Sequence, residues 1–188
     1  LTPGTLGANT AVGQMWTRQG KIGAALELDG TDDRVSVADK SDWAFGTNPF
    51  TIALWAKWNS LANIESIIGQ STGGGNVAKW ALVQNMNTSY AYDSTKLTFM
   101  VYNAGESFAV WNWTPAIGTW YHIAITRSGN SFNLYVNGVQ TGGTQTTVVT
   151  IPDVASDLRI GSDGEAWNFF SGLIDDVKIY NYARTADQ

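Results

Sequence analysis

Short runs of alternating apolar and polar residues constrain the fold of this chain more than any other feature of its sequence. In the run 50–58 (FTIALWAKW), Phe50, Ile52 and Leu54 fall on one face, and Trp55 and Lys57 fall on the other. Successive side chains point to opposite sides only in an extended strand. The same alternation recurs in four further segments: 97–102, 120–126, 133–136 and 173–180. The pattern predicts an antiparallel all-β protein.

The segments between these runs are typical of turns rather than crossover helices. Asn137-Gly138 is a strong hairpin-turn signal, and the glycine run 73–75 indicates a loop. Helix is expected only as a turn or two within 60–70 and a 3₁₀ turn at 43–45. Many short strands without crossover helices predict a two-sheet sandwich or a barrel. With 188 residues and no visible linker, we expect one domain over 1–188, cut from a longer surface or secreted protein.

Composition excludes several functional classes. The net charge is -5 with only 11 Lys and Arg residues, which makes nucleic acid and anionic lipid poor partners. No apolar run approaches the ~18 residues of a membrane helix, so we expect no membrane insertion. The chain has no Cys and a single His, which excludes disulfides, thiolate chemistry and His-rich metal sites.

Five segments in order resemble laminin-G-like domains of the concanavalin A-like lectin/glucanase superfamily: 20–30 (GKIGAALELDG), 50–57, 120–126, 134–138 and 172–184. The resemblance implies a jelly roll of two antiparallel sheets, one with a concave outer face. The superfamily holds lectins, enzyme-appended sugar modules, adhesins and spacers, so fold alone does not define function. We expect a non-catalytic module, secreted or at the cell surface, that binds carbohydrate. The alternative is a structural or adhesive module that packs against neighbouring surface-protein domains and binds no sugar.

The alternation also predicts which side chains avoid the core. It places Trp55, Tyr102, His122 and Tyr135 on outer strand faces. Aromatic rings stack on the apolar faces of sugar rings, and nearby polar groups such as Gln84, Asn112 and Asn133 then supply specificity. We interpret these four residues as a candidate glycan-binding face. The alternative is that they serve the fold and are covered by loops or by each other.

Loop aromatics form a second candidate site. Trp111 and Trp113 share one face if their segment is extended, and Trp167 precedes the last strand in the run 167–170 (WNFF). Tryptophans at a loop rim are typical lectin contacts. In the alternative reading they cover the ends of the sandwich, since Trp is usually well packed.

Acidic residues suggest calcium. Asp29, Asp32 and Asp33 surround a tight turn, and Asp175 opens the last strand. In the families that the chain resembles, calcium often joins these two segments, and Ca²⁺ prefers six to eight oxygen ligands. We therefore expect a structural Ca²⁺ held by these four residues. In the alternative, Asp29 and Asp33 cap the turn by hydrogen bonds, and one aspartate at 175 or 176 pairs with Arg34 or Arg184.

Catalysis is not expected. Related glycosidases carry Glu-x-Asp-x-(x)-Glu on one strand, whereas here Glu27 and Asp29 are followed by a glycine turn that carries Asp32 and Asp33 off the strand. A glycosidase needs two carboxyl groups roughly 5–10 Å apart. No spacing in this chain predicts such a pair.

Overall fold

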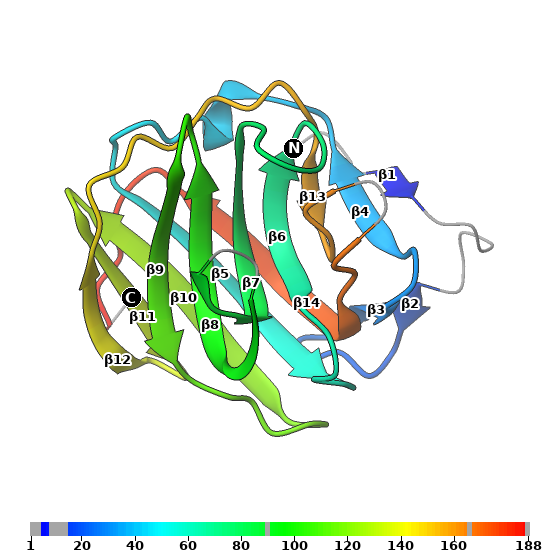
Figure 1. Ribbon diagram of the computed structural model, residues 1–188. Coiled ribbons are helices and arrows are strands. Elements are labelled where there is room, and N and C mark those ends of the chain that lie inside the picture. Colours follow the sequence, from blue (N-terminus) through cyan, green and yellow to red (C-terminus); the bar gives the residue numbers. More distant parts are fainter. Residues whose placement is uncertain (1–4, 8–14, 89–90, 165–166, 187–188) are drawn as a thin grey trace.

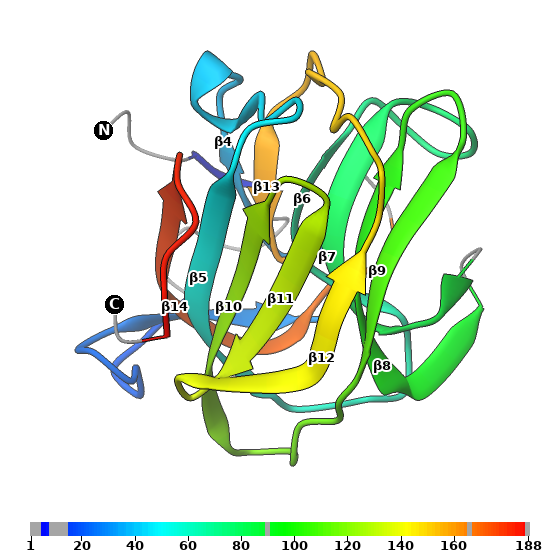
Figure 2. The same ribbon diagram turned by 90° about the vertical axis from the view of Figure 1, so that its left-hand side faces the viewer.

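Two seven-stranded sheets stack face to face and enclose the hydrophobic core (Figures 1 and 2). They are seen in a computed structural model that describes residues 5–7, 15–88, 91–164 and 167–186. The front sheet, nearer the viewer in Figure 1, contains in spatial order β1 (Thr5–Gly7), β4 (Arg34–Val37), β13 (Leu158–Ile160), β6 (Glu65–Ser71), β7 (Lys79–Met86), β8 (Tyr92–Tyr102) and β9 (Glu106–Asn112).

The back sheet lies behind it in Figure 1, and Figure 2 shows it after a turn of 90°. Its spatial order is β12 (Val139–Thr146), β11 (Ser131–Val136), β10 (Trp120–Ser128), β5 (Phe50–Trp58), β14 (Ser171–Tyr180), β3 (Ala25–Asp29) and β2 (Trp16–Thr17). Every neighbouring pair in both sheets is antiparallel. The predicted antiparallel sandwich is therefore confirmed.

The core lies between the sheets, where the inward residues of each strand meet. Its largest buried side chains are aromatic, and they contact one another in offset or edge-on geometry. Phe50 stacks on Phe45 with ring centroids 4.3 Å apart, and Trp80 meets Phe99 at 6.0 Å. Such pairs add stability beyond their buried area. The aromatic-rich composition is thus used largely for packing.

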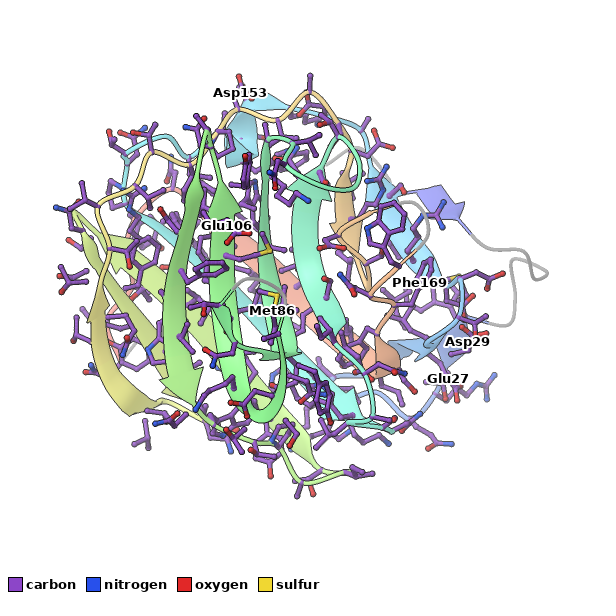
Figure 3. All side chains as sticks on the ribbon, in the orientation of Figure 1. Glu27, Asp29, Met86, Glu106, Asp153 and Phe169 are labelled. Carbon is purple, nitrogen blue, oxygen red and sulfur yellow. The ribbon has the colours of Figure 1, made fainter. Side chains whose placement is uncertain are left out.

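The outer face of the front sheet carries a second, smaller apolar cluster: Ala81, Val83, Met86 and Met100. Ile64 and Phe108 pack against this cluster, and the hydroxyl of Thr98 donates to the Met86 carbonyl. Figure 3 shows Met86 on the face turned to the viewer, with Glu106 beyond it. This outer face is therefore a partly covered surface rather than a flat solvated one.

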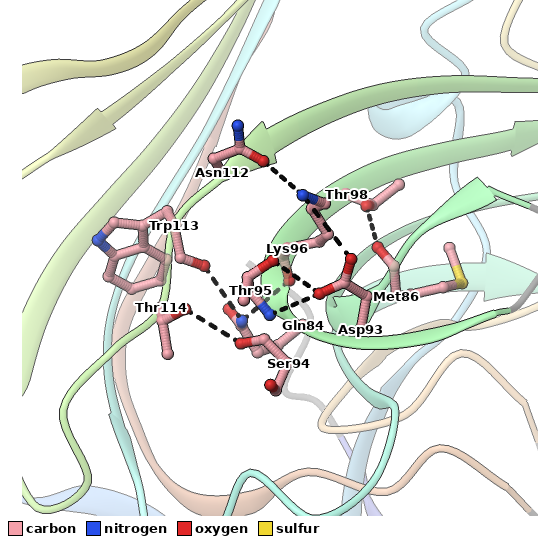
Figure 4. A network of polar contacts seen from close by, with 10 residues as sticks. All are labelled: Gln84, Met86, Asp93, Ser94, Thr95, Lys96, Thr98, Asn112, Trp113 and Thr114. Atoms are coloured by element: carbon pink, nitrogen blue, oxygen red, sulfur yellow. Dashed lines mark hydrogen bonds and ion pairs between the residues drawn. The ribbon is translucent and has the colours of Figure 1, made fainter.

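Polar contacts fix the lower end of the β7–β8–β9 segment (Figure 4). Gln84 donates through Nε2 to the Lys96 carbonyl at 2.9 Å, and Lys96 donates through Nζ to Asn112 Oδ1 at 2.5 Å. Asn133 accepts hydrogen bonds from Gln140 and Thr144. The three amides that we expected to serve a ligand are thus engaged within the protein.

Helix is nearly absent from the described residues, as predicted. A 3₁₀ turn is present at Ser41–Trp43, two residues before the predicted 43–45, and the helical turn expected within 60–70 is wrong. Residues 65–71 form β6, which pairs with β7 on one side and β13 on the other. Ladder bonds on both edges override a weak local helical preference. No helix in the described part of the chain is long and apolar enough to cross a membrane.

Candidate functional site

The predicted outer-face aromatics divide between the two sheets. Trp55, His122 and Tyr135 lie on the back sheet, where His122 pairs with Trp55 and Ala124 pairs with Tyr135. Tyr102 lies on the front sheet, where its strand neighbours are Lys79 and Glu106. The expectation of one face holding all four residues is wrong, because alternation gives the side of a strand but not the sheet to which it belongs.

The back-sheet face holds two adjoining cavities that share His122. One, of about 440 Å³, is lined by Lys21, Trp55, Trp120, His122 and Asn137. The other, of about 220 Å³, extends along β10 to Tyr135, Tyr180 and Arg184. The three predicted aromatics therefore do lie beside hollows in the surface.

Cations cover the ring faces of this back-sheet surface. The Lys21 ammonium lies 4.8 Å from the centroid of the Trp55 ring, and Arg184 lies 4.5 Å from that of Tyr180. A third contact joins Lys57 to Trp120 at 5.6 Å. A ring that already holds a cation offers less apolar face to a sugar. The back face is therefore a poor stacking platform.

His122 is half-buried among these residues, with its ring centroid 5.3 Å from that of Trp55. Burial lowers the pKa of His122, and the positive charges of Lys178 and Arg184 lower it further, while Asp176 opposes them. The imidazole is therefore neutral near pH 7. This environment fits a packed strand residue.

Trp111 and Trp113 face inward. Trp111 is fully buried and donates through Nε1 to the Gly143 carbonyl at 3.0 Å, which joins β9 to β12. Trp113 packs against Trp58 and Tyr121 at the edge of the core. Both indoles do share one face, but it is the core face. The prediction that these two tryptophans contact a ligand is therefore wrong, because Trp111 packs within the core and Trp113 packs at its edge.

Trp167 is different, because its indole is 45% exposed beside the outer face of the front sheet. It lines a cavity of about 410 Å³, here named the Trp167 cavity. The lining consists of Gly74, Gly75, Asn76, Lys79, Glu106, Asp163, Trp167 and Asn168. The volume lies within the range of ordinary ligand sites.

Glycines hold the Trp167 indole in place. A Cβ added at Gly74 would lie 3.0 Å from indole carbons, and one at Gly164 would lie 2.7 Å from Nε1. Only residues without a side chain allow this close approach. The ring is therefore positioned by two loops before any ligand arrives, which lowers the entropy cost of binding.

Charged groups surround the same cavity. Lys79 is almost fully buried, and burial lowers its pKa while Asp163 and Glu106 oppose that effect. Burial raises the pKa of Asp163, and Lys79, Ser66 and Asn168 act in the opposite direction. An ammonium that interacts with two carboxylates gives the site both donors and acceptors. Sequence reasoning missed this group because its members come from β7, β9 and a distant loop.

A second cavity adjoins the first. It measures about 490 Å³ and is lined by Gly30, Ala62, Asn63, Ile64, Tyr92, Asn168 and Phe169; we name it the Tyr92 cavity. Tyr92 is 53% exposed, and its hydroxyl donates to the Leu61 carbonyl at 2.7 Å. Asn168 lines both cavities.

The acidic turn forms in part as predicted. One carboxylate oxygen from each of Asp29, Asp32 and Asp33 lies within 4.8 Å of the others. Asp29 Oδ1 also accepts from the Thr31 amide at 2.7 Å, and Asp33 Oδ2 accepts from the Asp29 amide at 3.2 Å. The hydrogen-bonded turn is thus present.

Asp175 does not join that group. Ser171 pairs with Asp29, and Asp175 is four residues further along β14, roughly 13 Å away at the usual strand rise. Its carboxylate accepts from the Ile22 amide at 2.8 Å. The four-residue calcium site that we expected is therefore wrong at one position, Asp175. Asp176 pairs with Lys178 at 2.5 Å.

Glu65 is the most strongly perturbed acid among the described residues. It is buried on β6 opposite Gln84, and burial raises its pKa to about 8. It does not line the Trp167 or Tyr92 cavity. A buried acid away from these cavities does not form the paired carboxylates of a glycosidase.

Comparison with known proteins defines the class of the fold. Residues 29–188 match the Laminin_G_3 model, described as the concanavalin A-like lectin/glucanases superfamily, and the chain belongs to this family. The predicted resemblance is confirmed. No curated protein sequence matches the chain significantly.

Several solved structures share the sandwich. Domain 4 of AbnA, a GH43 extracellular arabinanase from Geobacillus stearothermophilus in complex with arabinotriose, has a TM-score of 0.76 at 22% identity, over 99% of this chain and 85% of that one. The CBM40 of the Ruminococcus gnavus IT-sialidase bound to α2,3 sialyllactose has a TM-score of 0.65 at 15% identity, over 87% and 92%. The botulinum neurotoxin serotype G binding domain has a TM-score of 0.66 at 15% identity, over 98% and 44%. At these identities the likeness establishes the fold alone.

Proposed function

We propose that this chain is a non-catalytic carbohydrate-binding module, secreted or at the cell surface, that binds glycans in the Trp167 cavity. One observation carries the proposal: an exposed indole, held by Gly74 and Gly164, lies beside the charged and polar groups of a cavity of ligand size. An indole desolvates one face of a sugar ring, and flanking polar groups bond its hydroxyls. Structural relatives bound to arabinotriose and sialyllactose support this reading.

Tyr102 belongs to the same site. It stands between Lys79 and Glu106 in the register of the front sheet, and both neighbours line the Trp167 cavity. Trp55, His122 and Tyr135 remain candidates for a weaker contact surface on the back sheet. The cations that cover its rings make that face the second choice.

The test is isothermal titration of W167A and the parent chain with a panel of glycans. We expect W167A to lose at least tenfold in affinity for the best glycan, because removing one stacked ring costs on the order of 1.4 kcal/mol. Trp16 is similarly exposed, at 54%, but lies on the back sheet, so W16A is the matched control. Equal binding by W167A and the parent would exclude the Trp167 cavity.

A structural or adhesive module is the second candidate. The half-buried, cation-covered aromatics of the back sheet favour it, since such a surface packs against another domain without exposing bare rings. A blank glycan panel for the parent chain, with the protein folded, would favour this function over sugar binding.

We also propose a structural Ca²⁺ at Asp29, Asp32 and Asp33. Three carboxylates within 4.8 Å fit the hard oxygen ligands that Ca²⁺ prefers, with backbone carbonyls and water completing the shell. Thermal melts with calcium and with chelator test the site. A rise in Tm with calcium that D32A abolishes would support it, and identical melts at millimolar calcium would exclude it.

A further inference from the structure

The Trp167 and Tyr92 cavities meet at one residue of the loop before β14. Asn168 lines both cavities and has a left-handed backbone with φ of 56°. Its carbonyl accepts from the Ser66 amide at 2.7 Å, which fixes the loop to β6. Phe169, the next residue, lines the Tyr92 cavity. The two hollows thus lie side by side over the front sheet.

Each hollow has its own exposed ring. Trp167 lines the first cavity at 45% exposure, and Tyr92 lines the second at 53%. Both rings are held in place: Trp167 by close contact with Gly74 and Gly164, and Tyr92 by the hydroxyl bond to the Leu61 carbonyl. One isolated ring suits a single sugar, whereas two fixed rings with a polar amide between them suit successive sugars of a chain.

We propose that the joined cavities form one groove that binds an uncharged glycan chain, with one sugar unit on Trp167 and a following unit on Tyr92. The proposal deepens the proposed function and rests on it. The side-chain amide of Asn168, at the junction, donates one hydrogen bond to Asp163, and its second N–H and its oxygen then serve the hydroxyls between the two rings.

The charges favour an uncharged ligand. Among the residues that line the two cavities, Lys79 is the one cation, and it already interacts with Asp163 and Glu106. Arg159, which also lies on this face, donates to the Ser71 carbonyl. None of the described residues that line the Tyr92 cavity is charged. A carboxylate on the ligand would meet two acids for each base, so sialylated or uronic-acid glycans fit poorly.

The experiment is titration calorimetry with arabinan, xylan and glucan oligosaccharides of increasing length, alongside sialyllactose and oligogalacturonate. We expect the affinity for a neutral series to rise as the chain lengthens and then to level off. The acidic glycans should bind at least tenfold more weakly.

Variants assign the two ends of the groove. Y92A should weaken binding of the longer chains roughly tenfold, and leave binding of the shortest bound sugar unchanged, because only longer chains reach the second ring. Y92F keeps the ring but loses the hydroxyl bond to Leu61 that holds it, so its affinity for longer chains should fall between those of the parent and Y92A. W167A should weaken the binding of glycan chains of every length, and W16A should weaken the binding of none. Circular dichroism of each variant shows whether it is folded.

Two kinds of failure are distinguishable. In the first kind, glycans bind and W167A weakens that binding, but the affinity does not depend on chain length or Y92A binds long chains normally. The proposed function then stands, and the groove is wrong. Stronger binding of sialyllactose or oligogalacturonate than of any neutral chain would also overturn the groove. If no glycan of any length binds the folded parent, the proposed function itself fails.

Discussion

At the scale of single residues, the absence of side chains at two positions decides where an indole lies. Gly74 and Gly164 contact Trp167 from two loops, and a Cβ at either would collide with it or press against it. Side chains at these two positions would displace the ring from its observed place. The position of the proposed stacking ring therefore depends on the absence of side chains at Gly74 and Gly164.

The variant G164A should move the Trp167 ring. Its Cβ would stand 2.7 Å from Nε1, closer than atoms pack, so the indole must shift. We expect glycan affinity to fall about tenfold, with circular dichroism unchanged, measured by calorimetry. The control is G105A, because a Cβ at Gly105 meets nothing within 4 Å. Unaltered affinity in G164A would show that the position of the ring does not matter.

Glu65 makes stability depend on pH in a defined direction. Burial raises its pKa from 4.5 to about 8, so between these values the folded chain keeps a proton that the unfolded chain releases. The contribution of Glu65 to stability is therefore full below pH 4.5 and falls as the pH rises toward 8.

The variant E65Q should remove this dependence, since glutamine does not ionise. At pH 8.5 we expect E65Q to be roughly 2–4 kcal/mol more stable relative to the parent than it is at pH 4.5. Urea unfolding at the two pH values measures the difference. The exposed Glu27 supplies the control E27Q, which should show no such change. A pH-independent difference between E65Q and the parent would contradict the account.

At the scale of elements, the turn between β3 and β4 is held by its own acids. Asp29 Oδ1 accepts from the amides of Thr31 and Asp32, at 2.7 and 3.4 Å. These bonds do not require a metal, so their contribution is separable from that of calcium.

In chelator, D29A should lose about 1–2 kcal/mol of unfolding free energy, because two turn amides lose their acceptor. The control D32A removes an acid that accepts neither bond, and it should unfold close to the parent in chelator. Chemical denaturation measures both variants. A loss in D32A as large as that in D29A would mean that charge, not hydrogen bonding, controls the turn.

Much of the fold is predictable at this scale. The strand over 50–58 matches β5 residue for residue, and Asn137 and Gly138 both have the positive φ values that their hairpin turn requires. β6 escaped prediction because its run ESIIGQS is buried on both faces and so does not alternate. The candidate site could not be predicted from the sequence, for a different reason. Lys79, Glu106 and Asp163 meet only through the pairing of distant strands, and one sequence without an alignment does not reveal that pairing.

At the scale of the whole molecule, the two faces are unlike each other. The back sheet presents rings covered by cations, while the front sheet presents rings fixed by glycines and a backbone hydrogen bond. Both faces are hollowed, and among the described residues it is the front cavities that are lined by exposed aromatic rings together with polar groups. Ligand binding is therefore expected on one side.

A bound glycan should stabilise the entire sandwich. At a hundred times its dissociation constant, a ligand adds about 2.7 kcal/mol, which raises the Tm of a chain of this size by roughly 5–10 °C. Scanning calorimetry with the best neutral oligosaccharide checks the shift, and W167A should lose it. A shift retained in full by W167A would place the binding on another surface, with the back sheet the next to examine.

The junction at Asn168 separates what the protein recognises from what keeps it folded. Trp167, Asn168 and Phe169 are successive residues of one loop, and all three line the proposed groove, while the large buried side chains of the core stand mainly on strands. Substitutions in this single loop can therefore alter ligand choice while the sandwich stays intact. In evolution, substitutions in a few consecutive codons of this loop can change which polysaccharide such a module binds. A small library of loop variants gives protein engineers the same access to new ligands.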